Sequence, residues 1–274
     1  MRVIFVPVSD RPECVVALRS AFNLGKLLDA SITGCHIRAH RDSSIALLND
    51  NSDKDNVVLE NNASAKSLFS RFSEDHDYKF SNKPKSTAVA LWLEKIGSPE
   101  KLFSIMGPVS DLIIVSRPAK KGKSLARRFM MSALLNSARP VIILPQLQAP
   151  TIGKRISIAW NQSTQAASAV AAAMPLLCQA DKVNIITCGP ENRTGPKSKH
   201  LKKYLNSWGI KAKHVKAKGD NETQALINGF NETKSDLLVM GGYSRNRLKQ
   251  RIFGGVTEFM IQQANIPVLM LHIG

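Results

Sequence analysis

The stretch MGGYSRNRLKQRIFGGVTEFM, residues 240–260, combines the residue types that bind phosphate groups. A glycine pair stands near each end, and Arg245, Arg247, Lys249 and Arg251 lie between the pairs. Glycine permits backbone conformations with positive φ and lets a ligand approach the chain closely. The second pair begins a predicted helix, and the free N–H groups at the start of a helix favour an anion. The stretch therefore predicts a phosphate-binding loop, with a solvated basic loop as the alternative.

The start of that helix supplies the predicted phosphate ligands. They are the N–H groups of Gly255, Val256 and Thr257 and the Thr257 hydroxyl, while Arg245 adds positive charge from the loop. The stretch is not a Walker loop, because no G-K-[ST] follows and the glycine pairs stand too far apart. The residues alone leave both alternatives open.

The second half of the chain alternates strands and helices. We predict strands at 155–160, 182–188, 211–217, 236–241 and 267–272, and helices at 164–179, 197–208, 221–233 and 255–264. Most of these strands are nearly continuous apolar runs, typical of parallel strands covered by helices on both faces. The exception, 211–217, alternates lysine with smaller residues, which predicts an edge strand. The pattern predicts a doubly wound α/β domain, in which ligands bind beyond the carboxyl ends of the strands.

The first half repeats this plan. SDLIIVSRP (110–118) resembles SDLLVMGGY (235–243), and ARPVIILP resembles NIPVLMLH. We therefore predict two domains, 1–147 and 148–274, joined by the Pro- and Gly-containing segment QLQAPTIGK. In the first copy we expect a long polar loop at 40–56, a helix at 57–73 and a strand at 87–94.

The composition is that of a globular chain. Of its 274 residues 43% are hydrophobic and 22% charged, which excludes a disordered protein. The net charge of +17 favours anionic partners without identifying one. Only 6% of the residues are aromatic and no stacking array is visible, so nucleic acid is an unlikely partner. The N-terminal apolar run is too short for a signal peptide and no stretch is long enough to span a membrane, so we expect a cytoplasmic protein.

Other chemistry-bearing residues predict no additional site. His36 and His40 straddle a strand end, where residues four apart are too distant to share a metal. The four cysteines form no C-x-x-C pair, so we expect reduced, buried thiols. Asp236 is interpreted as a helix–strand junction residue, and Trp92 and Trp208 as packing residues.

The glycine-containing stretch resembles the universal stress protein family. Nucleotide-binding members of that family carry G-x2-G-x9-G-[S/T] here, where this sequence has Gly241, Ser244, Gly254 and Gly255 at the same spacing. The resemblance covers nearly the whole chain and implies two tandem doubly wound domains. Each would have a five-stranded, mostly parallel sheet of the adenine nucleotide alpha hydrolase-like kind. It also implies an intrachain pseudo-dimer in which the last strand of each copy, 140–145 and 267–272, lies beside the other.

The resemblance further implies an ATP site in the second domain, with Mg as a companion of the nucleotide. Asn161 stands where the family commonly has an Asp that contacts the nucleoside, Ala159 lies just before it, and Cys188 is at the adenine-facing position. The ribose and phosphates would be lined by Gly241, Ser244, Gly254, Gly255, Val256 and Thr257.

Three departures from the family pattern keep other functions open. Ser244 replaces a glycine, Gly255 replaces a hydroxyl residue, and Asn161 lacks the charge of Asp. The first copy has lost the glycine motif altogether. The alternatives are a module that binds unknown regulatory proteins without a nucleotide, and a nonspecific nucleic-acid binder. No predicted site residue is a convincing general base, so we expect at most weak ATPase activity, and whether two chains form a further homodimer stays open.

Overall fold

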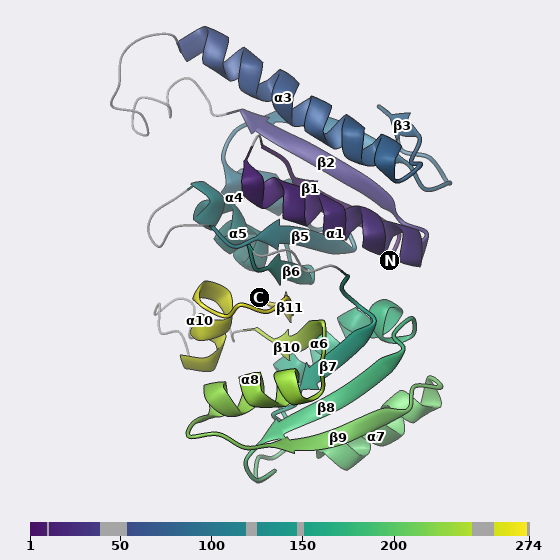
Figure 1. The fold of residues 1–274 in the computed structure, drawn as a ribbon, viewed down its shortest axis with the longest axis vertical. Helices are drawn as coiled ribbons and strands as arrows, with labels where there is room; N and C mark the ends of the chain where they lie inside the picture. The colour runs from purple at the N-terminus through teal and green to yellow at the C-terminus, as the bar shows by residue number, and fades with distance from the viewer. Residues whose placement is uncertain (10, 39–53, 119–124, 147–150, 243–254, 273–274) are drawn as a thin grey trace. The chain divides into compact units, whose positions relative to one another are not determined.

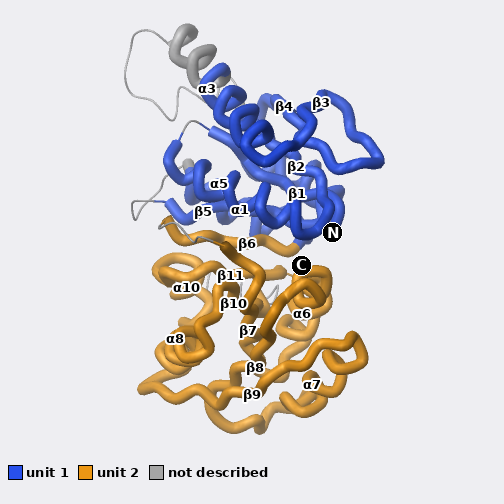
Figure 2. Tube along the Cα trace, turned by 45° about the vertical axis from the view of Figure 1, so that its right-hand side comes forward, with its two compact units in different colours: residues 1–139 blue, residues 140–274 orange. Residues whose placement is uncertain are grey.

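The computed structural model describes residues 1–9, 11–38, 54–118, 125–146, 151–242 and 255–272. The chain divides into two compact units, residues 1–139 and 140–274 (Figure 2). Each unit is a mostly parallel sheet with helices, which confirms the predicted fold class. No helix in these described ranges is long and apolar enough to cross a membrane.

Unit 1 contains a parallel sheet in the order β3-β4-β2-β1-β5. Its strands are β1 (Val3–Pro7), β2 (Ser31–Arg38), β3 (Phe80–Ser81), β4 (Ala90–Ile96) and β5 (Leu112–Ser116). Its helices are α1 (Pro12–Leu28), α3 (Lys54–Asp75), α4 (Pro99–Met106) and α5 (Leu125–Asn136).

The sequence predictions for unit 1 hold with two corrections. The predicted helix at 57–73 corresponds to α3 and the predicted strand at 87–94 to β4, which begins only at Ala90. The predicted loop at 40–56 is wrong for 54–56, because α3 already begins at Lys54; the remainder lies outside the described residues. The short strand β3 was not predicted, since two residues carry no periodic pattern.

Aromatic residues fill the space between α3 and the sheet of unit 1. A Cβ at Gly34 of β2 would lie 2.5 Å from the ring of Phe69, so only glycine lets α3 approach this closely. Trp92 lies 5.4 Å from Phe69 between ring centroids and is 6% exposed, which confirms its predicted packing role. The same prediction is wrong for Trp208, which is 55% exposed because it caps the C-terminal end of α7 at the surface.

Unit 2 contains a sheet in the order β6-β11-β10-β7-β8-β9. Its strands are β6 (Val141–Leu144), β7 (Arg155–Ala159), β8 (Lys182–Cys188), β9 (Ala212–Ala217), β10 (Leu237–Gly241) and β11 (Val268–Leu271). Its helices are α6 (Thr164–Leu177), α7 (Ser198–Ser207), α8 (Glu222–Glu232) and α10 (Gly255–Gln262). Helices α8 and α10 pack together on one face of the sheet, and α6 and α7 lie on the other (Figure 1). These elements agree with the sequence predictions to within a few residues, and β9 is the edge strand that its lysines predict.

Strand β6 belongs to the first sequence repeat but pairs with the second. It runs antiparallel to β11, with Ile143 opposite Val268. This pairing confirms the predicted neighbourhood of the two last strands. It also places the division between the compact units at residues 139 and 140. The repeat boundary at 147 and 148 stays a prediction about where the two sequence copies join.

Asp236 holds the entry of the chain into the sheet of unit 2. Its carboxylate oxygens accept backbone N–H groups from Gly153 at 2.8 Å, Lys154 at 3.2 Å and Arg155 at 2.9 Å. A carboxylate can accept several such bonds at once because each oxygen offers two lone pairs. The interpretation of Asp236 as a junction residue is therefore confirmed.

We expect Asp236→Ala to lower the free energy of unfolding by about 3 kcal/mol, because three amides, that of Gly153 part-buried, lose their acceptor. The equivalent Asp111 of the first repeat accepts only two amides, from Arg2 and Val3, so Asp111→Ala should cost less, about 2 kcal/mol. Urea denaturation of both variants measures the difference. A larger loss for Asp111→Ala than for Asp236→Ala would contradict this account.

Candidate functional site

A cavity of about 310 Å³ lies at the carboxyl ends of β7, β8 and β10. A cavity of this size can enclose much of a small ligand. It is lined by Ala159, Trp160, Asn161, Ser163, Gln165, Ile186, Cys188, Arg193, Glu222, Leu226, Met240, Gly241, Gly242, Val256 and Thr257. Parallel pairing brings these segments to the same edge of the sheet, where doubly wound folds bind ligands.

Six of the ten predicted site residues line this cavity: Ala159, Asn161, Cys188, Gly241, Val256 and Thr257. Gly255 begins α10 beside Val256 but is not part of the lining. Ser244, Arg245 and Gly254 lie outside the described residues.

Three helices begin at this cavity. Lining residues come from the start of α6 (Gln165), of α8 (Glu222) and of α10 (Val256 and Thr257). The unsatisfied N–H groups and the dipole of each helix place partial positive charge at its first turn. An anionic ligand would therefore be favoured by three helices at once.

The turn that starts α6 is held by Asn161 and Ser163. The Asn161 amide oxygen accepts the Ser163 hydroxyl at 2.6 Å and the Ser163 N–H at 3.2 Å. The Ser163 hydroxyl oxygen in turn accepts the N–H of Ala166 at 3.1 Å, which caps the helix. Asn161 therefore shapes the rim of the cavity as well as lining it.

The loop after β8 is fixed by two buried side chains that sequence reasoning missed. The Trp160 indole N–H donates to the Pro196 carbonyl at 2.8 Å. The Gln162 side-chain amide donates to the Arg193 carbonyl at 2.9 Å and accepts the Arg193 N–H at 3.2 Å. Gln162 also adopts a φ of 63°, a conformation that non-glycine residues rarely occupy. These contacts place Arg193 in the cavity wall. Its position in the loop after β8 was the sequence signal that could have indicated a site residue.

The two glycines of the predicted motif that the structure describes have different surroundings. A Cβ at Gly241 would lie 2.6 Å from the Ala166 nitrogen and the Gln165 carbonyl carbon, so this glycine is needed where β10 meets the first turn of α6. A Cβ at Gly255 would have no heavy atom within 4 Å. The fold therefore requires glycine at 241 and leaves open space at 255.

The charges around the cavity are mixed. Arg193 contributes a cation and Glu222 an anion. Burial, followed by the nearby Glu222 carboxylate, raises the pKa of the Cys188 thiol to about 11. The thiol is therefore neutral at physiological pH and forms an uncharged part of the wall.

We expect Cys188 to react slowly with iodoacetamide in the folded protein, because a pKa of about 11 leaves roughly one thiol in a thousand ionised at pH 8. The exposed Cys178 should be modified first. The Cys188 rate should rise about tenfold per pH unit between pH 8 and 10. Peptide mass spectrometry after timed quenching measures both sites, and equal rates at pH 8 would refute the assignment.

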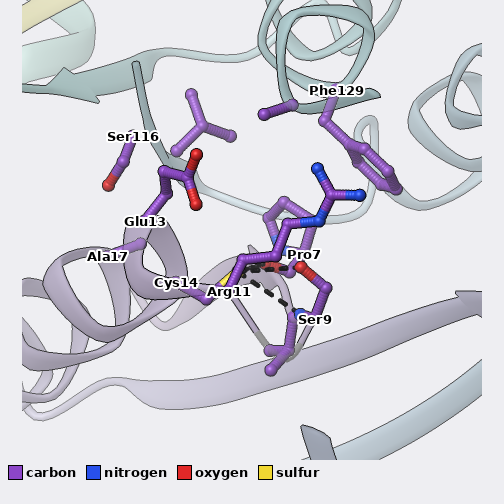
Figure 3. A pocket seen from close by; sticks show the side chains of 11 residues that line it. Pro7, Ser9, Arg11, Glu13, Cys14, Ala17, Ser116 and Phe129 are labelled. Atoms are coloured by element: carbon purple, nitrogen blue, oxygen red, sulfur yellow. Dashed lines mark hydrogen bonds between the residues drawn. The ribbon is translucent and has the colours of Figure 1, made fainter. Parts of the chain in front are cut away.

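The equivalent place in unit 1 holds a much smaller cavity, of about 50 Å³ (Figure 3). Alignment of SDLIIVS with SDLLVMG puts Ser116 at the position of Gly241, and counting back from β6 and β11 puts Phe129 at that of Val256. Both larger side chains line the small cavity. The first copy therefore has little room for a ligand of nucleotide size, in line with the loss of its glycine motif.

The other candidate residues form no second site. His36 is buried and its Nδ1 lies 3.0 Å from the Val8 carbonyl oxygen, while His40 lies outside the described residues. Within the described ranges no group of three or more His, Cys, Asp or Glu could hold a metal ion. The four cysteines form no disulfide, but the expectation that all are buried is wrong. Only Cys35 is buried, Cys14 and Cys188 are half-buried, and Cys178 is exposed because it caps the end of α6.

Comparison with known proteins supports the family resemblance of the second half. The sequence profile of the universal stress protein family matches residues 165–272, which include every lining residue of the cavity except Ala159, Trp160, Asn161 and Ser163. Residues 165–272 of this chain are therefore similar to the universal stress protein family. The first half lies outside the matched range.

Curated relatives support the same family over short segments. Universal stress protein MJ0577 of Methanocaldococcus jannaschii is 29% identical over 75 residues, 27% of this chain and 46% of the relative. Stress response protein NhaX of Bacillus subtilis is 38% identical over 48 residues, 18% of this chain and 29% of the relative. The matches thus span less than half the length of these relatives.

Solved structures match the whole chain. A universal stress protein from Archaeoglobus fulgidus superimposes with a TM-score of 0.75 at 16% identity, covering 99% of this chain and 98% of that one. A functionally unknown protein from Pseudomonas aeruginosa gives a TM-score of 0.61 at 16% identity, covering 99% and 92%. These likenesses show that both halves share the fold of tandem proteins.

Proposed function

We propose that this universal stress protein is a stress-response regulator that binds ATP or a related adenine nucleotide in its second domain. The observation that carries the proposal is the convergence of six family-site residues with three helix starts around one cavity. A ligand that binds one conformation more tightly than another shifts the population of the two, so nucleotide binding could report to a partner protein.

The cavity offers different chemistry at its different walls. Ile186, Leu226 and the neutral thiol of Cys188 form an apolar wall suited to a base. The first turn of α10, with Val256 and Thr257, offers N–H groups and a hydroxyl suited to phosphate oxygens. Mg²⁺ would arrive bound to the phosphates, since the described residues present no cluster of metal-ligating side chains.

Binding explains the site better than catalysis. Glu222 is the one carboxylate among the described lining residues, and it lies close enough to Cys188 to raise the pKa of the thiol. Glu222 therefore lies beside the wall proposed to bind the adenine. A general base for ATP hydrolysis would have to lie near the phosphates instead.

The direct test is calorimetric titration of the whole protein with Mg-ATP, AMP and adenosine at moderate salt. We expect saturable binding of one ATP per chain, because the cavity at the equivalent strand edge of the first domain is only about 50 Å³. Two sites per chain would contradict the assignment of the first domain, and no heat with any nucleotide would overturn the proposal.

We expect Gly255→Ser to strengthen ATP binding by about threefold to tenfold, because it restores the hydroxyl of the family motif at a position with open space. Its free energy of unfolding should change little. The complementary variant Thr257→Val should weaken ATP binding by a similar factor and leave adenosine binding unchanged. If Thr257→Val affects ATP and adenosine equally, the phosphates do not lie at α10.

One observation favours the module that binds partner proteins without a nucleotide. The negative charge of Glu222 in the cavity reduces the attraction for a polyanion. The variant Glu222→Gln separates the two functions, since removing this charge should raise affinity for ATP if the cavity binds phosphates. DNA binding that falls steeply with salt and shows no sequence preference would reflect the net charge of +17 alone.

A further inference from the structure

Helix α4 of unit 1 covers less of its sheet than the corresponding helix of unit 2. Both α4 and α8 follow the third main strand of their repeat, but α4 has 8 residues and α8 has 11. Helix α8 packs over both β8 and β9, whereas α4 packs chiefly against α5 (Figure 1). The face of β2 and β4 beneath α4 is therefore only partly covered.

That face of the sheet is apolar. Side chains alternate along a strand, so Leu91 and Leu93 of β4 point away from Trp92, which packs under α3. Phe5 and Thr33 of the neighbouring strands lie on the same face as these leucines. Phe103 of α4 covers Phe5 at 5.9 Å between ring centroids, but the leucines remain partly exposed.

Two cavities flank α4 on this face and share Met106. One, of about 360 Å³, runs along Leu91 and Leu93 to Val109. The other, of about 120 Å³, lies between Ile96 and Ile105. Together they make a continuous groove around the exposed side of α4.

Large aliphatic side chains on this groove face solvent. Ile96 is 66% exposed, Ile105 58% and Val109 68%. Single exposed apolar residues are ordinary, but a contiguous apolar patch with a polar rim marks an interaction surface.

The rim of the groove is basic. Lys95 and Lys101 line the smaller cavity, and Lys85 lines the larger one. No ion pair joins any of these lysines to another described residue. Nearby acids are engaged: Asp29 pairs with Arg2, and Glu100 pairs with Arg128.

We propose that this surface, the α4 groove (Lys95, Ile96, Lys101, Ile105, Met106 and Val109), binds an acidic amphipathic helix of a partner protein. An aliphatic groove accepts the apolar face of such a helix, whose leucines recur every three or four residues. The basic rim selects acidic residues at the edges of that face and disfavours basic ones. A second copy of this chain that offers the same surface is a poor occupant, because its lysines would face Lys95 and Lys101 of the groove.

The test uses the full chain and a fluorescein-labelled peptide of about 16 residues, with leucine on one face and Glu or Asp on the rest. Fluorescence anisotropy should show saturable binding. A matched peptide with Lys in place of every acidic residue should bind at least about tenfold more weakly, and so should one with Ser in place of every leucine. Equal binding of the acidic and basic peptides, or no binding of either, overturns the proposal.

Variants locate the binding on α4. Ile105→Ser combined with Val109→Ser should weaken the acidic peptide about tenfold, and Lys95→Glu combined with Lys101→Glu should do so most clearly at low salt. All four residues are exposed, so circular dichroism should show an unchanged fold. The matched control is Trp208→Ser, which removes an exposed apolar side chain from unit 2 and should leave binding unchanged.

Two further measurements exclude other occupants. Sedimentation equilibrium tests whether the groove is a contact between two copies of the chain. Self-association that Ile105→Ser abolishes would show such a contact, and we expect none. The Thr257→Val variant, which should bind ATP more weakly, should bind the acidic peptide with unchanged affinity. Failure of the nucleotide proposal and failure of this one are therefore distinguishable.

Discussion

Parallel pairing of β7 with β8 and β10 is the constraint on which the site depends. Parallel strands end at the same edge, so the segments that follow them meet there although they are far apart in the sequence. Lining residues of the cavity come from the first turns of α6, α8 and α10 at this edge. The proposed preference for an anionic ligand thus rests on topology before any charged side chain is considered.

Close approach of backbone segments controls how much room that edge retains. At Gly241 the strand end touches the first turn of α6, and no side chain fits there. The first repeat has Ser116 at the matching position and Phe129 in place of Val256, and its cavity shrinks from about 310 to about 50 Å³. Two copies of one fold therefore differ in cavity volume because a few side chains differ in size. Unit 1 also has the shorter helix, α4, beside an apolar face with a basic rim.

The charges close to each surface, rather than the net charge of the chain, decide which partner that surface favours. The net charge of +17 suggests a polyanion partner, yet the cavity of unit 2 combines Arg193 with Glu222. The α4 groove gains its basic character from Lys95 and Lys101. An ion pair such as Arg128 with Glu100 neutralises part of the surface. Partner choice is therefore a property of each surface and is tested separately for each.

The sequence by itself determined the elements, the repeat and the family resemblance. Apolar runs and helix periodicity are local signals, so β7 to β11, the edge position of β9 and the junction role of Asp236 were predictable. The pairing of the last strands was predicted only from the family resemblance. The family motif also named six residues that line the cavity. Tertiary structure alone decided that Trp160 and Gln162 hold the loop of Arg193, that Glu222 enters the cavity, and that Cys178 and Trp208 face solvent. These outcomes depend on which distant segments the sheet brings together and which surfaces the helices cover, and neither is encoded in the spacing of residues along the chain.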